Sequence, residues 1–265
     1  MKRFETLYDI LCDTGDLLQE GRRREHLPLT DRVRGLMETL HDGEQVDHGG
    51  RAGGDSVHPV ESPLPGLPER RRRLEALIAG VKQCTRCPLS LGRTFSVPGE
   101  GVLDPLVMFI GEGPGRDEDE SGRPFVGAAG RYLDRWLTAI GLSRETNAYI
   151  TNIVKCRPPE NRDPQPEESD ACAPWLHEQI SLVRPRMIVT LGRISTRILT
   201  GTTQGITRIH GTFYSLNGIP LVPTFHPSAV LRRDEWRRPV WEDLKAVRNW
   251  LVDNVGHEPP EDPTG

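Results

Sequence analysis

Short apolar runs alternate with longer stretches of helical periodicity between residues 69 and 251. Four runs are rich in Val, Ile or aromatic residues, which is typical of strands buried on both faces: 106–110, 149–154, 187–191 and 220–225. Apolar residues at helical spacing predict helices at 128–140, 167–183, 193–199 and 236–251. This alternation predicts an α/β fold, a three-layer α/β/α sandwich around a central, mostly parallel four-stranded sheet.

The pattern changes on both sides of this region. Residues 1–40 have apolar positions at helical spacing and predict a helical N-terminal extension, which we expect to bind another protein. Residues 41–68 contain 6 Gly and 4 Pro but no aromatic residue, a composition typical of a flexible linker. One globular domain is expected at 69–254, followed by a disordered tail at 255–265.

Composition narrows the class of protein. The chain has 265 residues, 35% hydrophobic and 27% charged, which is ordinary for a globular protein that buries a core. Its first residues do not resemble a secretory signal, and no apolar run approaches the roughly 20 residues that span a bilayer. We therefore expect a cytoplasmic monomer with no membrane partner. The net charge of −4 argues against a protein that wraps broadly around nucleic acid, but it permits a small surface that contacts nucleic acid.

Glycine and polar residues follow each predicted strand. The sequence GEGPG at 111–115 follows the first strand, Asn152 lies at the end of the second, and Gly192 and His226 follow the third and fourth. Ligands of parallel sheets bind beyond the carboxyl ends of the strands, so these loops are expected to line one crevice. The glycine-rich loop lacks the Lys-Ser/Thr of a P-loop and is followed by acidic residues, which disfavours a polyphosphate ligand.

Four of the five cysteines have the spacing of a metal site. Cys84 and Cys87 form a CxxC pair, and Cys156 and Cys172 follow farther along the chain. Four thiolates bind either zinc or an iron–sulfur cluster, and the spacing does not separate the two. The wide second pair is unlike a zinc ribbon. Unconnected buried thiols are the alternative, and Cys12, in the extension, is a spare thiol.

Three motifs closely resemble those of the iron–sulfur family 4 uracil-DNA glycosylases. They are GEGPGRDEDESGRPFVGAAG at 111–130, TNIVKCRPPENRDPQPEE at 151–168 and PTFHPSAVLR at 223–232. The likeness runs from about residue 70 to 251 and identifies 69–254 as a uracil-DNA glycosylase domain. It implies a [4Fe–4S] cluster held by Cys84, Cys87, Cys156 and Cys172, and uracil-containing DNA, single- or double-stranded, as the partner.

The resemblance also implies roles for individual residues. His226 is expected to stabilise the departing uracil at O2, while Glu112 and Gly113 line the pocket and hold the attacking water. Asn152 is expected to read the edge of the base, and the other base-binding residues are Phe125, which stacks on it, and Glu118, which lies against C5. Contacts to DNA are expected from Lys155, Ser228, Leu231 and Arg232.

The resemblance implies hydrolysis of the N-glycosidic bond of deoxyuridine after the base has flipped out of the helix, leaving an abasic site. One alternative is a protein of the same fold that senses uracil in DNA without turnover, or traps the sugar covalently. A weaker alternative is a nucleotide-phosphate hydrolase that uses the acidic loop and a divalent metal. His210-Gly211 also departs from the family, whose members commonly have Arg-Gly there.

Overall fold

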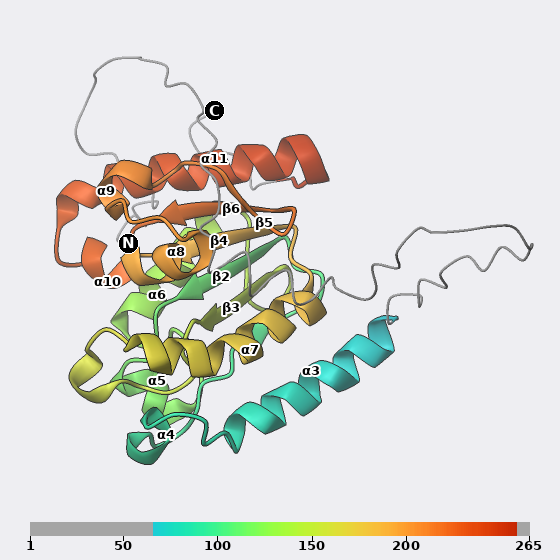
Figure 1. Cartoon of the computed structure of the whole chain (residues 1–265). Helices are drawn as coiled ribbons and strands as arrows, with labels where there is room; N and C mark the ends of the chain where they lie inside the picture. Colours follow the sequence, from blue (N-terminus) through green and yellow to red (C-terminus); the bar gives the residue numbers. More distant parts are fainter. Residues whose placement is uncertain (1–65, 259–265) are drawn as a thin grey trace, which may run out of the picture.

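The computed structural model describes residues 66–258, and their core is one sheet of six strands in the order β1-β3-β2-β4-β6-β5 (Figure 1). The strands β2, β3, β4 and β6 run parallel, and the edge strands β1 and β5 are antiparallel to their neighbours. Their bounds are β1 Glu100–Gly101, β2 Val107–Gly111, β3 Ala148–Asn152, β4 Met187–Leu191, β5 Tyr214–Leu216 and β6 Ile219–Thr224. The predicted fold class and the four parallel strands are confirmed.

The predicted number of strands was wrong because both edge strands are too short to show an apolar pattern. β1 has 2 residues and β5 has 3. A local signal for β5 was present in the sequence: Asn217 and Gly218 connect it to β6, and both have positive φ angles, 50° and 82°. Asn-Gly at such a position is typical of a two-residue hairpin turn.

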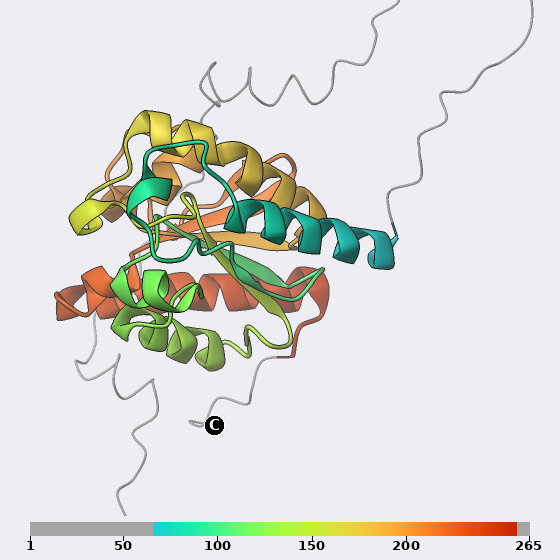
Figure 2. The same ribbon diagram turned by 90° about the horizontal axis from the view of Figure 1, so that it is seen from below.

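Helices cover both faces of the sheet and complete the three layers (Figure 2). Helices α3 (Leu67–Lys82) and α7 (Pro166–Val183) lie on one face, and α6 (Ala128–Ala139) and α11 (Arg237–Val255) lie on the other. Alternate residues of β2 enter the two cores: Phe109 packs on the side of α6 and α11, and Met108 on the side of α3 and α7. All residues of the four parallel strands except the first two of β6 are buried, which explains their continuous apolar sequence.

Further elements fill the connections between these layers. The shorter helices are α4 Leu89–Gly92, α5 Arg116–Ser121, α8 Arg193–Thr200, α9 Ile206–Ile209 and α10 Pro227–Val230, with single 3-10 turns at Pro159–Asn161 and Asp234–Trp236. All four predicted helices are present within a few residues of their expected bounds. Among the described helices, none is long and apolar enough to cross a membrane.

The ends of the domain differ slightly from the prediction. Helix α3 begins at Leu67, inside the predicted linker, and α11 continues to Val255, the first residue of the predicted tail. The buried side chain of Arg70 connects α3 to the loop before β2 and to α7. It pairs with Asp104 of that loop and donates to the carbonyl of Leu182 of α7 at 3.0 Å. The predicted extension at 1–40, most of the linker and residues 259–265 lie outside the described residues.

Candidate active site

A cavity of about 410 Å³ lies beyond the carboxyl ends of β2, β3 and β6. The loops after these strands meet there because parallel strands end at the same edge of the sheet. All of the predicted catalytic and base-binding residues line it, together with two of the predicted DNA contacts and several residues of the loop after β3. The lining comprises Glu112, Gly113, Pro114, Gly115, Glu118, Phe125, Ala129, Asn152, Pro158, Asn161, Arg162, Asp163, His226, Ser228 and Arg232.

Asn152 places a buried amide in this cavity. It is the last residue of β3, paired with Gly111 of β2, and it is 1% exposed. Neither Oδ1 nor Nδ2 has a hydrogen-bond partner among the described residues. A side chain at Gly111 would collide with the Asn152 amide and the Phe125 ring, so glycine is what allows both to lie here. A buried unpaired polar group costs about 1–3 kcal/mol, which indicates an amide kept free for a ligand.

His226 is held as a neutral imidazole. It is the N-cap of α10, where its Nδ1 accepts a hydrogen bond from the backbone N–H of Ser228 at 3.1 Å and lies 2.8 Å from the Ser228 hydroxyl. Burial, and then the nearby charge of Arg232, lower the pKa of His226 to about 4. Because the backbone N–H occupies Nδ1, the neutral ring carries its hydrogen on Nε2, where it can donate to a ligand.

Phe125 and Glu118 shape the wall of the cavity beside His226. The Phe125 ring is buried, and its centroid lies 5.6 Å from that of His226, with the two planes at 33°. The Glu118 carboxylate accepts backbone N–H groups on both sides of the loop: from Gly115 at 3.1 Å, and from Val126 and Gly127 at 2.9 Å each. Glu118 therefore faces the cavity while it fixes the loop that carries Phe125.

Glu112 is a carboxyl group with an unusual proton affinity. Burial, and then the nearby charge of Asp163, raise the pKa of Glu112 to about 7, against the opposing effect of Arg193. Asp163 and Arg193 pair with each other at 2.5 Å. At Gly113 a side chain would press on Val154, so no larger residue fits that position without a shift. Glu112 and Asp163 are thus the neighbouring carboxyl groups in this part of the cavity.

Asp163 is a functional candidate that the sequence interpretation missed. It lies with Asn161 and Arg162 in the loop after β3, which folds back over the cavity. Arg162 is fixed there by a double hydrogen bond to Glu168, at 2.7 and 2.8 Å, at the start of α7. The motif at 151–168 included these residues, but their positions depend on the path of the loop, which has no periodic signal.

Two of the predicted DNA contacts line the mouth of the cavity. Ser228 and Arg232 are both among its lining residues, and Arg232 is exposed. Leu231, which precedes Arg232 in the chain, is 45% exposed and free to contact a large partner. Exposed cationic and apolar groups beside a pocket match the expected contacts to a nucleic acid, which stay a prediction.

The predicted DNA contact of Lys155 was wrong. Its side chain is 1% exposed, and its ammonium group donates to the Thr151 hydroxyl at 2.5 Å, the Gln179 side-chain oxygen at 2.7 Å and the Asn152 carbonyl at 2.9 Å. Burial lowers the pKa of Lys155 to about 8. Because all three hydrogen bonds go to interior groups, Lys155 supports the backbone at Asn152 and does not reach the surface.

The predicted cysteine ligands come together in a second, smaller cavity. Cys84, Cys87, Cys156 and Cys172 all line it, and none of them forms a disulfide. Hydrogen-bond donors face two of the sulfurs: Arg93 lies 2.9 Å from Cys156 Sγ, and the Trp175 ring N–H lies 3.3 Å from Cys84 Sγ. Cysteines from three segments of the chain thus line one cavity.

Comparison with known proteins agrees with this arrangement. Residues 98–245 match the family model of the uracil DNA glycosylase superfamily. A type-4 uracil-DNA glycosylase of Thermotoga maritima is 45% identical over 186 residues, covering 69% of this chain and 96% of the relative. One of Sulfurisphaera tokodaii is 44% identical over 188 residues, covering 68% and 85%. The chain belongs to the type-4 uracil-DNA glycosylases.

Another relative is a uracil-DNA glycosylase of a different type. A type-5 uracil-DNA glycosylase of Pyrobaculum aerophilum is 35% identical over 150 residues, which cover 50% of this chain and 65% of that protein. The family match begins at residue 98 and so includes Cys156 and Cys172 but neither cysteine of the CxxC pair. The longer alignments with the type-4 proteins extend over about two thirds of the chain.

His210, the departure from the family pattern, belongs to a separate cluster. Its Nδ1 lies 2.9 Å from a carboxylate oxygen of the buried Asp243, which also accepts from the Thr224 hydroxyl at 2.7 Å. A side chain at Gly211, whose φ is +70°, would press on that same carboxylate. His210 is not among the residues that line the cavity with Asn152, so its position does not favour covalent trapping of a sugar there.

Proposed function

We propose that this glycosylase hydrolyses the N-glycosidic bond between uracil and deoxyribose in DNA, releasing uracil and leaving an abasic site. The observation that carries the proposal is the buried amide of Asn152, which has no partner among the described residues and shares one cavity with His226 and Phe125. The cavity is lined by residues of the loops that follow the strands, and a base in duplex DNA reaches such a pocket only after leaving the helical stack.

Recognition of the base follows from groups that are already fixed. Asn152 donates from Nδ2 to uracil O4 and accepts at Oδ1 from N3–H, whereas cytosine presents a donor and an acceptor in the opposite order. Phe125 stacks on the ring of the base. Glu118, whose carboxylate is immobilised by three backbone N–H groups, forms the rigid wall at C5 that a thymine methyl group would strike.

Bond cleavage makes use of the neutral state of His226. The bond from C1′ to uracil N1 breaks, and its electron pair leaves with the base, so negative charge develops on O2 while the sugar becomes cationic. The Nε2–H of His226 donates to O2 at this stage. The neutral imidazole donates this hydrogen bond from Nε2. The Ser228 backbone N–H donates to Nδ1 and so keeps the ring hydrogen of His226 on Nε2.

Water completes the reaction on the sugar. Its oxygen bonds to C1′ and its proton is released to a nearby acceptor, which balances the loss of the uracil anion. Glu112, with its pKa of about 7, lies in the same cavity and stabilises the cationic sugar when it is ionised. Gly113 has no side chain that could take a proton from the water, and Glu112 acts on the sugar through its charge.

An excision assay tests this function directly. A single-stranded oligonucleotide with one uracil is incubated with a tenfold lower amount of protein, and the abasic product is counted after alkaline cleavage. We expect many turnovers and no change on adding a chelator of divalent metals. Stoichiometric binding without product would favour a sensor, and a protein–DNA band that survives denaturation would favour covalent trapping. Products released only with a divalent metal would favour the phosphohydrolase.

We also propose that the cysteine cavity holds a [4Fe–4S] cluster. The four cysteines line one cavity and none of them forms a disulfide, so all four thiols are available as ligands. Four thiolates are the usual ligand set of a [4Fe–4S] cluster. N–H donors from Arg93 and Trp175 suit sulfurs that carry negative charge. The cluster, where bound, would join the CxxC segment to β3 and α7.

Metal analysis separates the two possibilities for the cysteines. Protein purified without oxygen should contain about four iron and four sulfide per chain and absorb visible light. Cys172→Ser should lose most of the iron, whereas Cys12→Ser, outside the described residues, should keep all of it. Stoichiometric zinc with no sulfide would refute the cluster and leave the excision proposal untouched.

A further inference from the structure

Phe125 has a backbone conformation that is rarely adopted by residues other than glycine. Its φ angle is +52°, in the left-handed region where the side chain approaches the backbone, so other contacts must maintain it. Phe125 also lines two cavities: the one that holds Asn152, and another of about 440 Å³, here called the Arg144 cavity, that includes Arg123, Asp134 and Arg144. The ring therefore has space to leave the base-binding cavity if its backbone is released.

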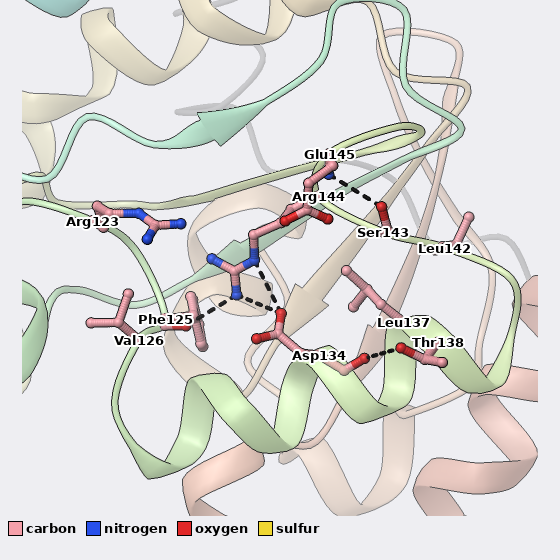
Figure 3. A pocket seen from close by; sticks show the side chains of 10 residues that line it. All are labelled: Arg123, Phe125, Val126, Asp134, Leu137, Thr138, Leu142, Ser143, Arg144 and Glu145. Atoms are coloured by element: carbon pink, nitrogen blue, oxygen red, sulfur yellow. Dashed lines mark hydrogen bonds and ion pairs between the residues drawn. The ribbon is translucent and has the colours of Figure 1, made fainter.

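Arg144 contacts the backbone on either side of Phe125 from the side of the Arg144 cavity. Its guanidinium donates to the Pro124 carbonyl at 3.0 Å and to the Phe125 carbonyl at 3.1 Å. Figure 3 shows the guanidinium directed at Phe125 and Asp134. The two carbonyls flank the φ and ψ bonds of Phe125, so together they define its rotation.

Arg144 is itself immobilised by two carboxylates. Asp134 of α6 accepts from Nε at 3.0 Å and from Nη2 at 2.6 Å, and Glu100 of β1 pairs with Nη1. The Arg144 side chain is 9% exposed, so solvent competes little with these bonds. A planar guanidinium can serve two carbonyls and two carboxylates at once, which a lysine ammonium with three donors cannot.

Two other contacts act on the same peptide but not through Arg144. Glu118 accepts the N–H groups of Val126 and Gly127, and Gly130 of α6 approaches the Phe125 carbonyl so closely that any side chain there would overlap it. Among the described residues, Phe125 is the one member of the base-binding cavity to which Arg144 donates a hydrogen bond. Its effect on that cavity must therefore pass through the Phe125 backbone.

We propose that Arg144 is a positioning residue for base recognition, and that it fixes the left-handed conformation of Phe125 so that the ring stacks on the flipped base. The inference rests on the proposed uracil excision. It assigns a role in substrate binding to a residue that lies in the loop between α6 and β3, outside the cavity that contains the base.

The main test uses Arg144→Lys, which keeps the positive charge between Glu100 and Asp134 but cannot hold both carbonyls. We expect kcat/KM on the uracil oligonucleotide to fall about tenfold, equivalent to about 1.4 kcal/mol, with affinity for free uracil falling by a similar factor. Arg123→Gln is the matched control, because Arg123 also pairs with Glu100, at 2.9 Å, but is exposed and has no bond to either carbonyl. It should change both quantities less than twofold.

A double-mutant cycle with Phe125→Ala separates positioning from a general structural role. If Arg144 acts through the ring, Arg144→Lys should cost about tenfold in the parent but less than twofold once the ring is gone. An equal loss in both backgrounds, or no loss in the parent, would overturn the proposal. Should Arg144→Lys fail to fold, Asp134→Asn weakens the same guanidinium and is expected to show the same dependence on Phe125.

Calorimetric binding of free uracil keeps the two proposals apart. It requires no turnover, so a parent protein that binds uracil without excising it would refute the excision proposal alone. The dependence of the Arg144→Lys effect on Phe125 would still be measured in binding, and its absence there would refute the positioning role alone.

Discussion

Replacing Asn152 with leucine should stabilise the fold and abolish function. Leucine has a similar shape and leaves no polar atom unpaired, whereas the amide of Asn152 has two buried groups without partners among the described residues. Such groups cost about 1–3 kcal/mol, so we expect a gain of about 1 kcal/mol in the free energy of unfolding after imperfect packing is included. In a domain of this size that raises the melting temperature by about 2–4 °C.

The same substitution removes both hydrogen bonds that we propose between Asn152 and the edge of uracil. At about 1.5 kcal/mol for each bond, the loss is about 3 kcal/mol, or more than about 100-fold in kcat/KM. Excision is measured on a single-stranded uracil oligonucleotide, and stability by thermal unfolding of the same preparations. Gain of stability with loss of activity is the signature of a polar group maintained for a ligand.

Asn147→Leu provides the matched control for this prediction. Asn147 accepts from the Ser143 N–H at 2.8 Å and donates to the Gly141 carbonyl at 3.0 Å, so the structure satisfies both ends of its amide. Its replacement should lower the melting temperature and leave kcat/KM nearly unchanged. The reasoning fails if Asn152→Leu lowers the melting temperature as Asn147→Leu does, or if it retains excision within about tenfold of the parent.

Three further results are expected. Ser228→Ala should lower kcat about three- to tenfold, because the hydroxyl is lost but the backbone N–H still orients His226; an unchanged kcat would mean that the hydroxyl has no part in orienting the ring. Arg232→Gln should reduce the slope of log Kd for DNA against log salt by about 1. Lys155→Met should leave that slope unchanged and lower the melting temperature, because the lysine is bound in the interior. Equal slopes for the two variants would contradict this interior placement. Since the pKa of Glu112 is raised to about 7, its carboxylate forms as pH rises through that value, so kcat/KM should increase from about pH 6 to 8 in the parent but stay flat in Glu112→Gln, as measured by pH–rate profiles.

The order of the buried strands, and the residues that line the cavity beyond them, could be predicted from the sequence. Strands buried on both faces must be apolar throughout, so β2, β3, β4 and β6 could be recognised from composition alone. The glycines and polar residues that follow them could be assigned to one edge because parallel strands end there. Edge strands as short as β1 and β5 carry no such pattern, and pairing with a neighbour is what makes them strands.

What each polar side chain does was decided by the tertiary structure. The family resemblance suggested that Lys155 contacts DNA, which requires an exposed ammonium group, whereas the carbonyl of Asn152 and the side chains of Thr151 and Gln179 bind it in the interior. The proton affinity of Glu112 and the support of Phe125 by Arg144 likewise arise from groups distant in sequence. Local patterns determine which segments are buried, but charge and hydrogen bonding depend on distances that exist only once those segments have packed together.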